Sequence, residues 1–413
     1  MMGRAGLAGV MDRAGAAGSG HSGGRAVDFT SALFLGMVHP SGELRPWRRL
    51  TTGAPAVLGV PAAAVRVARD LAGLTGGEAA VLARSTLHGL LDAVPCAAGR
   101  TGRVLLDSGV YPVARWAAAG AGCPVDTFAH HDPASLAVAV ARHPRHRPVV
   151  LADGLCVACG PVPLAAYLRV LRPYDGLVIL DDTQALGLLG TRQSGPPRDV
   201  HRPGNGPVDG DAASGTDHGW DETGLRRAPY GLGGGGSLRW HGVDPARVLV
   251  VASLAKAFGA PVAAVVGPGE LIAAVARSGP AQVHTSPPSS ADLRAAEHAL
   301  DRNDAVGDRL RVRLAGLVGR FRHRVRAAGL PLGAGPLPIQ RVPLGAAGPG
   351  VHRRLGEAGV RAVLARVGGH REVAVTFAVT ARHRPADIDV AARALVDAVR
   401  AEARARAADR GSR

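Results

Sequence analysis

Lysine is almost absent from this chain. Of its 49 basic residues only Lys256 is a lysine, and the other 48 are arginine. Arginine stays protonated in proteins, whereas a lysine can lose its proton and act as a nucleophile. A lone lysine among so many arginines is expected where a guanidinium cannot replace it, so Lys256 is the first candidate for a catalytic residue.

Aromatic residues and long apolar runs are also scarce. Aromatics make up 3% of the 413 residues, and no stretch of 18 uncharged apolar residues occurs. The second absence excludes a membrane-spanning helix, and we expect a cytoplasmic protein by default. The net charge of +16 would usually suggest nucleic acid, but the arginines are scattered and lack the aromatics that stack on bases. We interpret the charge as a bias of composition.

Cysteine is rare too, with four residues in the whole chain. Four are too few for a disulfide framework at this length. Cys156 and Cys159 form a C-x-x-C, but Gly160 and two prolines follow it and no second Cys/His pair stands at zinc spacing. We therefore interpret the pair as small buried residues and His130-His131 as exposed, and we predict no metal site.

Hydrophobic residues make up 46% of the chain and form short runs separated by helical patterns. Continuous apolar runs are typical of strands buried on both faces of a parallel or mixed sheet. The sequence therefore predicts an α/β fold, with strands at 103–106, 148–152, 177–180, 248–252 and 262–266. Helices are expected between them at 55–74, 133–142 and 164–171.

The remaining segments define the predicted domains. We expect a disordered leader at 1–27, a large domain at 28–290 and a linking helix with a small α+β domain at 291–413. The helix at 291–328 is expected to break near Asn303, before strands at 338–342 and 373–379 and a last helix at 385–407. Residues 191–236 are rich in Gly, Pro, Asp and Arg and are predicted to be a disordered insertion. Their Gly233–Gly236 run is interpreted as linker.

Polar side chains follow two of the predicted strands. Asp181 ends the run Leu177–Leu180, and Ser253 and Lys256 follow the run Val248–Ala252. Open α/β sheets place ligands at the carboxyl ends of their strands. A carboxylate that holds a ring nitrogen protonated, a lysine that forms a Schiff base and a hydroxyl for a phosphate together indicate pyridoxal 5'-phosphate (PLP) chemistry.

These motifs resemble the class I/II aminotransferase-fold PLP enzymes, and within them the α-oxoamine synthase branch. The family's S/T-x-x-K-A-x-G matches 253–259, its D-[DE]-A-H-x-x-G matches 181–187, and its polar-Pro-Pro loop matches 285–288. A final T-A-x-H matches 380–383. The resemblance implies a PLP-dependent transferase of fold type I. Its large α/β domain would hold a central, mostly parallel, seven-stranded sheet beside a smaller C-terminal α+β domain.

The resemblance also implies roles for individual residues. Lys256 would form the Schiff base and later shuttle a proton, and Asp181 would keep the pyridine nitrogen protonated. Ser253 and the helix start at Thr86-Leu87 would bind the phosphate. Thr285 would reach the phosphate in the partner subunit of a homodimer.

Other positions depart from the family pattern. Its ring-stacking histidine falls on Tyr111, which can also stack, and its second histidine falls on Gln184, which can donate a hydrogen bond but cannot titrate. The arginine that grips the substrate carboxylate falls on Thr376. Either Arg366 or Arg371 replaces it, or the substrate is not an ordinary α-amino acid.

The sequence therefore predicts acyl transfer from an acyl-CoA or acyl-carrier thioester to an amino-acid-derived carbanion. An aminotransferase on a specialised substrate and a PLP-binding protein with degenerate catalysis remain as alternatives. No nucleic-acid or membrane partner is expected.

Overall fold

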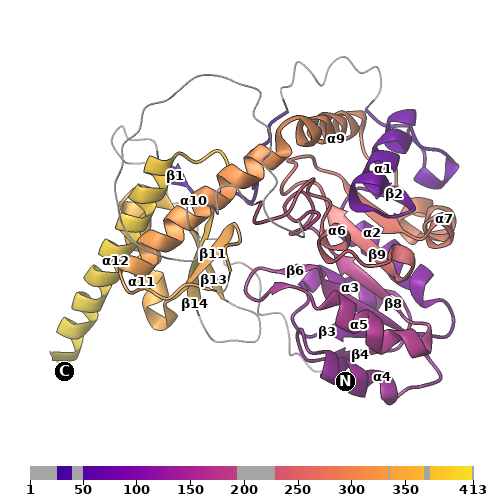
Figure 1. Ribbon diagram of the computed structural model, residues 1–413, viewed down its shortest axis with the longest axis horizontal. Helices are drawn as coiled ribbons and strands as arrows, with labels where there is room; N and C mark the ends of the chain where they lie inside the picture. Colours follow the sequence, from indigo (N-terminus) through magenta and orange to yellow (C-terminus); the bar gives the residue numbers. More distant parts are fainter. Residues whose placement is uncertain (1–25, 40–49, 193–227, 334, 367–372, 412–413) are drawn as a thin grey trace.

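A computed structural model describes residues 26–39, 50–192, 228–333, 335–366 and 373–411. Its large domain is built on a seven-stranded sheet (Figure 1) in the order β2-β10-β9-β8-β5-β3-β4. The strands are β2 (Ala79–Ala83), β3 (Gly102–Asp107), β4 (Val125–Phe128), β5 (Arg147–Asp153), β8 (Leu177–Asp181), β9 (Val248–Ser253) and β10 (Ala263–Gly267). Only β10 runs antiparallel to its neighbours, so the predicted mostly parallel sheet is confirmed.

Helices cover both faces of this sheet, as its strands require. In β9, Val248, Val250 and Ala252 belong to one buried cluster, and Leu249 and Val251 belong to the other. Side chains alternate between the two faces of a strand, so a strand buried on both sides reads as an uninterrupted apolar run. The covering helices are α1 (Ala62–Thr75), α2 (Thr86–Ala98), α3 (Pro112–Gly120), α4 (Pro133–Ala141), α5 (Leu164–Leu171), α7 (Gly269–Ser278) and α8 (Pro280–His284).

The predicted break in the long helix is present. A capping box at Ser289 starts α9 (Ser290–Arg302), a π-helical turn η5 (Asn303–Gly307) follows, and α10 (Asp308–Ala327) leads into the small domain. That domain packs α11 (Gly348–Glu357) and α12 (Pro385–Gly411) beside the antiparallel sheet β11-β14-β13. Its strands are β11 (Ile339–Pro343), β13 (Val363–Arg366) and β14 (Val373–Ala378).

The N-terminal segment lies on the small domain, although the sequence assigned it to a leader and the large domain. β1 (Val27–Asp28) pairs in parallel with β12 (Val360–Arg361). Phe29 stacks on His383 at 4.2 Å between ring centroids. Further along, His39 Nε2 lies 2.9 Å from the carbonyl oxygen of Phe258, in the loop that carries Lys256. The segment thus connects the small domain with that loop.

The ends of the predicted insertion correct the sequence interpretation. Residues 193–227 lie outside the described residues, but 228–236 pack into the large domain. The Gly187 N–H donates to Gly234 O at 2.7 Å, and the Gly236 N–H donates to Leu189 O at 2.7 Å. Tyr230 is buried. The Gly233–Gly236 run is therefore no linker: a Cβ added at Gly235 would overlap the carbonyl oxygen of Leu74, so the backbone there approaches too closely for a side chain.

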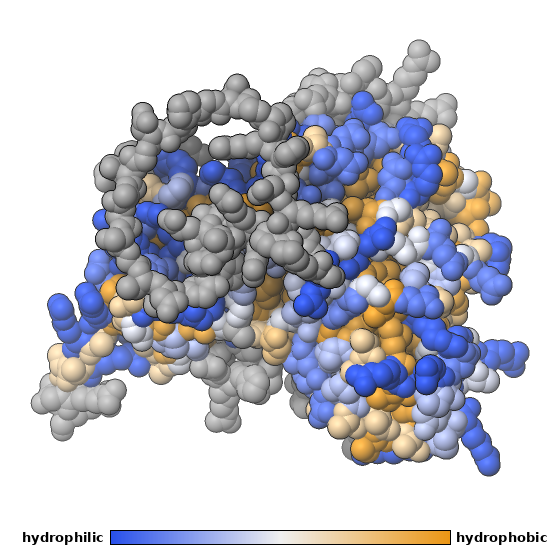
Figure 2. Space-filling model, viewed as in Figure 1, coloured by the Kyte–Doolittle hydropathy of each residue, from blue (hydrophilic) through white to orange (hydrophobic). Residues whose placement is uncertain are grey.

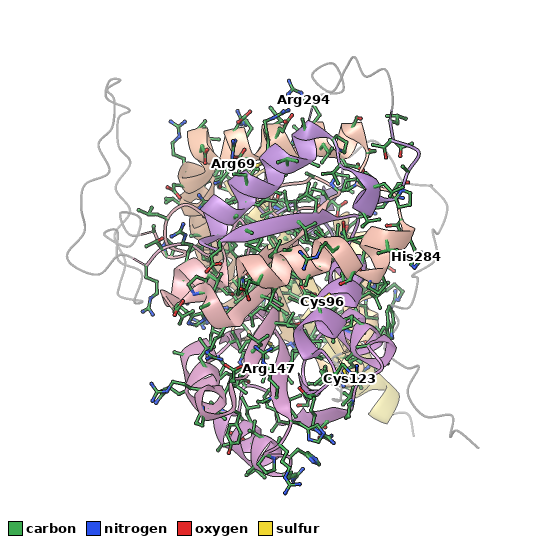
Figure 3. The ribbon with its side chains drawn as sticks, turned by 90° about the vertical axis from the view of Figure 1, so that its right-hand side faces the viewer. Arg69, Cys96, Cys123, Arg147, His284 and Arg294 are labelled. Atoms are coloured by element: carbon green, nitrogen blue, oxygen red, sulfur yellow. The ribbon has the colours of Figure 1, made fainter. Side chains whose placement is uncertain are left out.

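Hydrophilic side chains stand around the rim of the visible face, and apolar ones gather toward the lower right, over the large domain (Figure 2). Arginines such as Arg294 on α9 project outward (Figure 3) and pair with carboxylates, here with Glu297 at 3.0 Å. Within the described ranges, no helix combines the length and apolarity that crossing a membrane requires.

Candidate active site

Strands β8 and β9 bring the predicted catalytic residues to one edge of the sheet. Asp181, the last residue of β8, is paired with Val251 of the parallel strand β9. β9 ends at Ser253, whose N–H donates to the Thr183 hydroxyl at 3.1 Å. Lys256 lies in the turn between β9 and the returning strand β10. Asp181, Ser253 and Lys256 therefore lie at the same edge of the sheet.

The Asp181 carboxylate is buried, with 8% of the residue exposed. Its Oδ1 accepts the Thr183 N–H at 3.1 Å. Desolvation raises its pKa, while the bonds from Thr183 and the positive charge of Lys256 oppose that rise. A second cation placed against this carboxylate would further stabilise its ionised form.

A second carboxylate, Asp153, stands beside it and was not singled out from the sequence. Asp153 ends β5 and is directly paired with Asp181, and its Oδ1 accepts the Tyr111 N–H at 3.1 Å. Burial and the neighbouring Asp181 raise the pKa of Asp153 to about 7. The signal was present in the sequence, because Asp153 follows an apolar strand just as Asp181 does.

Asp182 has a structural role instead. It is 1% exposed and accepts both the N–H of Ser237, at 2.8 Å, and the Ser237 hydroxyl. Desolvation raises its pKa to about 6, against these hydrogen bonds. Ser237 directly follows the Gly233–Gly236 run, so Asp182 fixes that run against the strand that ends in Asp181.

Arg311 holds the other end of the same motif. This α10 residue is 1% exposed, and its Nη1 donates to Gly187 O and to Asn303 Oδ1, both at 2.9 Å. Asp308 pairs with its Nη2 at 2.7 Å. Desolvation lowers the pKa of Arg311, and Asp308 opposes the effect. The guanidinium thus links the 181–187 motif to the helix break at η5.

The predicted phosphate-binding helix start lies on the adjacent part of the sheet. Ser85 caps α2, and its hydroxyl accepts the His88 N–H at 3.4 Å. Thr86 and Leu87 form the first turn of α2. A Cβ built on Gly89 would lie 2.9 Å from Val251 in β9, so Gly89 allows the helix to approach that strand. The free N–H groups and the dipole of such a helix start favour an anion.

The described contacts do not bring together the remaining predicted site residues, which are Tyr111, Gln184 and Thr285. Tyr111 caps α3, is 57% exposed and is tied to the site by its bond to Asp153. Gln184 follows Asp181 in the same turn region, and its Oε1 is buried without a hydrogen-bond partner. The Thr285 hydroxyl donates to Ala281 O in its own helix at 2.7 Å, and no described contact joins Thr285 to Lys256.

On the substrate side, the small domain places an arginine opposite Thr376. Thr376 lies in β14 with its Oγ1 buried and unpartnered, directly opposite Arg341 of β11. Of the two arginines proposed to replace the missing one, Arg366 pairs with Val373 near the strand end and Arg371 lies outside the described residues. Arg341 was not singled out, because its pairing with Thr376 exists only in the folded sheet.

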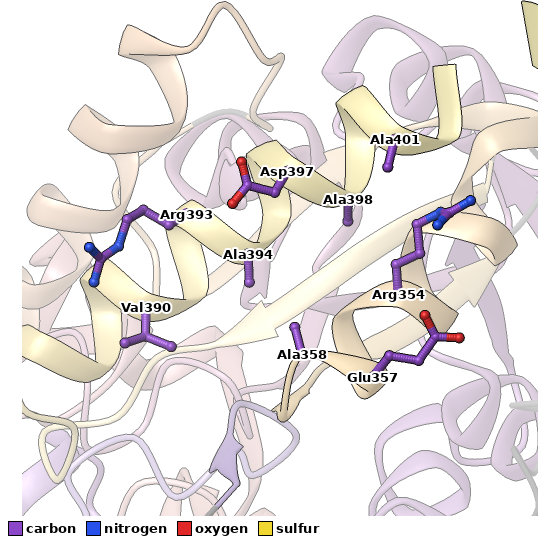
Figure 4. A pocket seen from close by; sticks show the side chains of 9 residues that line it. All are labelled: Arg354, Glu357, Ala358, Val390, Arg393, Ala394, Asp397, Ala398 and Ala401. Carbon is purple, nitrogen blue, oxygen red and sulfur yellow. The ribbon is translucent and has the colours of Figure 1, made fainter. Parts of the chain in front are cut away.

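A groove of about 460 Å³ lies between α11 and α12 in the small domain (Figure 4), away from Lys256. Arg354, Arg393 and Asp397 are among its lining residues. None of the candidate site residues lines it.

The residues at the sheet edge fit the cofactor indicated by the sequence. A buried carboxylate suits a protonated ring nitrogen, a lysine amine suits an aldehyde and an open helix start suits a phosphate. The buried Oε1 of Gln184, which has no hydrogen-bond partner, leaves hydrogen-bonding capacity for a further polar group.

The chain is similar to several known proteins. No protein-family model matches the chain. It is 34% identical over 145 residues to 8-amino-7-oxononanoate synthase of Methylobacterium radiotolerans, covering 34% of this chain and 37% of that enzyme. The alignments with the first relatives thus span less than half of their length. The Methylococcus capsulatus enzyme of the same name is 27% identical over 403 residues, covering 91% and 90%.

Among solved structures, a serine palmitoyltransferase variant from S. paucimobilis with bound PLP–myriocin superposes with a TM-score of 0.74. It is 16% identical and covers 92% of this chain and 88% of that one. The fold is that of fold type I PLP enzymes. The resemblance to α-oxoamine synthases stated from the sequence is confirmed at this modest identity, since the curated relatives are synthases of that branch. Within fold type I, the site residues lie at the sheet edge that the fold leaves open for a ligand.

Proposed function

We propose that this chain is a PLP-dependent transferase that transfers an acyl group from a thioester to an amino-acid-derived carbanion. The observation that carries the proposal is the buried Asp181 carboxylate beside Lys256, at the carboxyl ends of neighbouring parallel strands. Names of the curated relatives and the PLP bound to a structural neighbour support it. A homodimer in the cytoplasm is part of the proposal.

PLP, when bound, would supply an electron sink that stabilises negative charge at the substrate's α-carbon. The chain's residues provide the rest. The Lys256 amine would hold the cofactor covalently and, once released, move the proton at the α-carbon. Asp181 would hold the ring nitrogen protonated. Asp153, with its pKa near 7, would carry the proton of this carboxylate pair and leave the charge to Asp181.

Positioning follows from the neighbouring groups. The N–H groups at the start of α2, with Ser253, would bind the phosphate. The Gln184 side-chain amide would donate to the phenolic oxygen. In the acyl transfer, the new carbon–carbon bond forms as the carbon–sulfur bond of the thioester breaks, and the thiolate leaves.

Arg341 is our candidate for the carboxylate-binding group. Residues directly opposite in an antiparallel pair share a face of the sheet, with Cβ atoms about 5 Å apart. Arg341 therefore stands beside Thr376, where the family's arginine falls. Its charge also acts on Cys159 in the large domain, so it faces that domain. We expect Arg341→Gln to raise KM for the amine substrate roughly tenfold or more, with Arg366→Gln as control.

A spectrum of the purified protein tests the cofactor. Wild-type protein mixed with PLP should show a Schiff-base absorbance band, and borohydride should then fix the cofactor to the peptide that contains Lys256. Lys256→Arg keeps the charge but has no nucleophile, so the band and the fixed label should both be lost. A colourless wild type would refute the proposal.

A second assay tests the reaction. Release of free thiol from an acyl thioester, dependent on an amino acid, is expected of the synthase. Thr376 in place of arginine favours the alternative, a specialised aminotransferase. Exchange of the amino group with a keto acid, without thiol release, would establish that alternative. Light scattering of the holoprotein checks the dimer.

A further inference from the structure

A second cluster of reactive side chains lies near the same edge of the sheet. His130, His131 and Cys159 each present a donor atom, and the three atoms lie within 4.8 Å of one another. The histidines follow β4, and Cys159 lies in the turn between β6 (Leu155–Cys156) and β7 (Gly160–Pro161). The sequence showed a C-x-x-C without partners; the fold supplies two histidines from 25 or more residues earlier.

His130 is oriented as metal-binding histidines are. Its Nδ1 lies 2.6 Å from Oδ1 of Asp107, a carboxylate that is 1% exposed and also accepts the N–H groups of Gly109 and His131. A carboxylate accepts the Nδ1 proton and leaves the Nε2 lone pair free. This carboxylate–histidine arrangement is the usual outer support of a metal ligand.

His131 is held in an uncommon conformation with an unsatisfied nitrogen. Its φ is +54°, rare for a residue with a side chain. Its Nε2 is buried and has no hydrogen-bond partner, and its ring stacks on His130 at 4.0 Å. Burial and the neighbouring His130 lower the pKa of His131. The half-buried pair also corrects the expectation that both are exposed.

The C-x-x-C offers a second thiol, Cys156, beside the group of three close donor atoms. Cys159 is exposed and Cys156, three residues before it in the C-x-x-C, is half-buried. Desolvation and the neighbouring Cys156 raise the pKa of Cys159 to about 11, and Arg341 opposes this. A cation must therefore displace the proton on binding. Neither residue is the fully buried small side chain that the sequence predicted.

We propose that His130, His131, Cys159 and Cys156 bind one zinc ion. Two imidazoles and two thiolates are a donor set that zinc prefers, and C-x₂-C is its usual cysteine spacing. Ligand atoms around tetrahedral zinc lie about 3.3–3.8 Å apart, so the donor atoms of His130, His131 and Cys159 need to approach one another by about 1 Å, and Cys156 would join them as the fourth ligand. The ion would fasten the β6–β7 turn to the ends of β3 and β4. This inference is independent of the proposed function.

Cobalt and zinc binding to the reduced, untagged full chain tests the site. We expect one Co²⁺ per chain with a thiolate charge-transfer band, and one Zn²⁺ that displaces it. Cys159→Ser and His131→Gln should each weaken zinc binding more than about 100-fold, because loss of an outer partner alone costs about 10–100-fold. Cys159 is exposed, so its replacement does not threaten folding.

Cys123→Ser is the matched control, because Cys123 lies in the α3–β4 loop (Figure 3) outside the cluster. It should leave zinc binding unchanged. Zinc binding that survives both Cys159→Ser and His131→Gln overturns the proposal. A reduced chain that binds no zinc also overturns the proposal. This holds even if Cys156 and Cys159 of that protein form a disulfide when it is later exposed to air.

Discussion

The carboxylate pair Asp153–Asp181 makes the stability of the cofactor-free protein depend on pH. We consider Asp153→Asn, which keeps the oxygen that accepts the Tyr111 N–H and removes the titration. The pKa of Asp153 rises from 3.8 to about 7 on folding. The folded chain therefore keeps this proton to a higher pH than the unfolded chain does. The resulting advantage is complete below about pH 4 and is lost as the pH rises through 7.

The size of the effect follows from the same two values. Relative to low pH, the raised pKa of Asp153 lowers the unfolding free energy by about 2 kcal/mol at pH 5, where only the unfolded chain is ionised, and by about 4 kcal/mol at pH 8.5. Because Asp153 is partly accessible to solvent, both free energies are upper limits. Asp153→Asn should therefore gain about 2–3 kcal/mol more unfolding free energy, relative to wild type, at pH 8.5 than at pH 5.

Urea unfolding of cofactor-free wild type and Asp153→Asn at both pH values measures this difference. Asp301→Asn is the control, because Asp301 is an exposed carboxylate on α9, and its effect should be the same at both pH values. An Asp153→Asn gain that is equal at pH 5 and pH 8.5 would refute the reasoning, since Asp153 would then be ionised in the fold without cost.

Three further predictions concern the same region. Arg311→Met should lower the unfolding free energy by about 3–5 kcal/mol in urea titrations, because it leaves buried hydrogen-bond partners unpaired; an unchanged midpoint would contradict this. Gly236→Ala should lower the melting temperature more than Gly233→Ala, because both have positive φ but only at Gly236 would a Cβ overlap Asp182; equal losses would contradict it. Gln184→His should make the absorbance of the PLP-loaded protein titrate between about pH 5 and 8, as wild type should not.

Much of the fold could be predicted because strands buried on both faces read as continuous apolar runs, as 177–180 and 248–252 do. Asp181 and Lys256 could be predicted because they follow such runs. β4 was missed, because it is an edge strand with polar residues between its apolar ones. The Gly233–Gly236 run was misinterpreted, because composition cannot distinguish a flexible glycine run from one packed against backbone.

Contacts between distant segments set the limit of the sequence analysis. Arg341 stands beside Thr376 through strand pairing, and His130 meets Cys159 through the arrangement of β4 and the β6–β7 turn. Neither contact can be recognised from the residues that are adjacent in the sequence. The leader at 1–25 and the insertion at 193–227 lie outside the described residues, so these expectations stay predictions.

The segment from Val27 to His39 makes it possible to divide the protein into two fragments that reassemble. It supplies a strand and Phe29 to the small domain and reaches Phe258 in the lysine loop. A fragment that begins after this segment would lack one strand of the small domain and one support of the loop. A synthetic peptide of residues 26–39 should rebind such a fragment by β-strand addition, which makes the chain a natural candidate for fragment complementation.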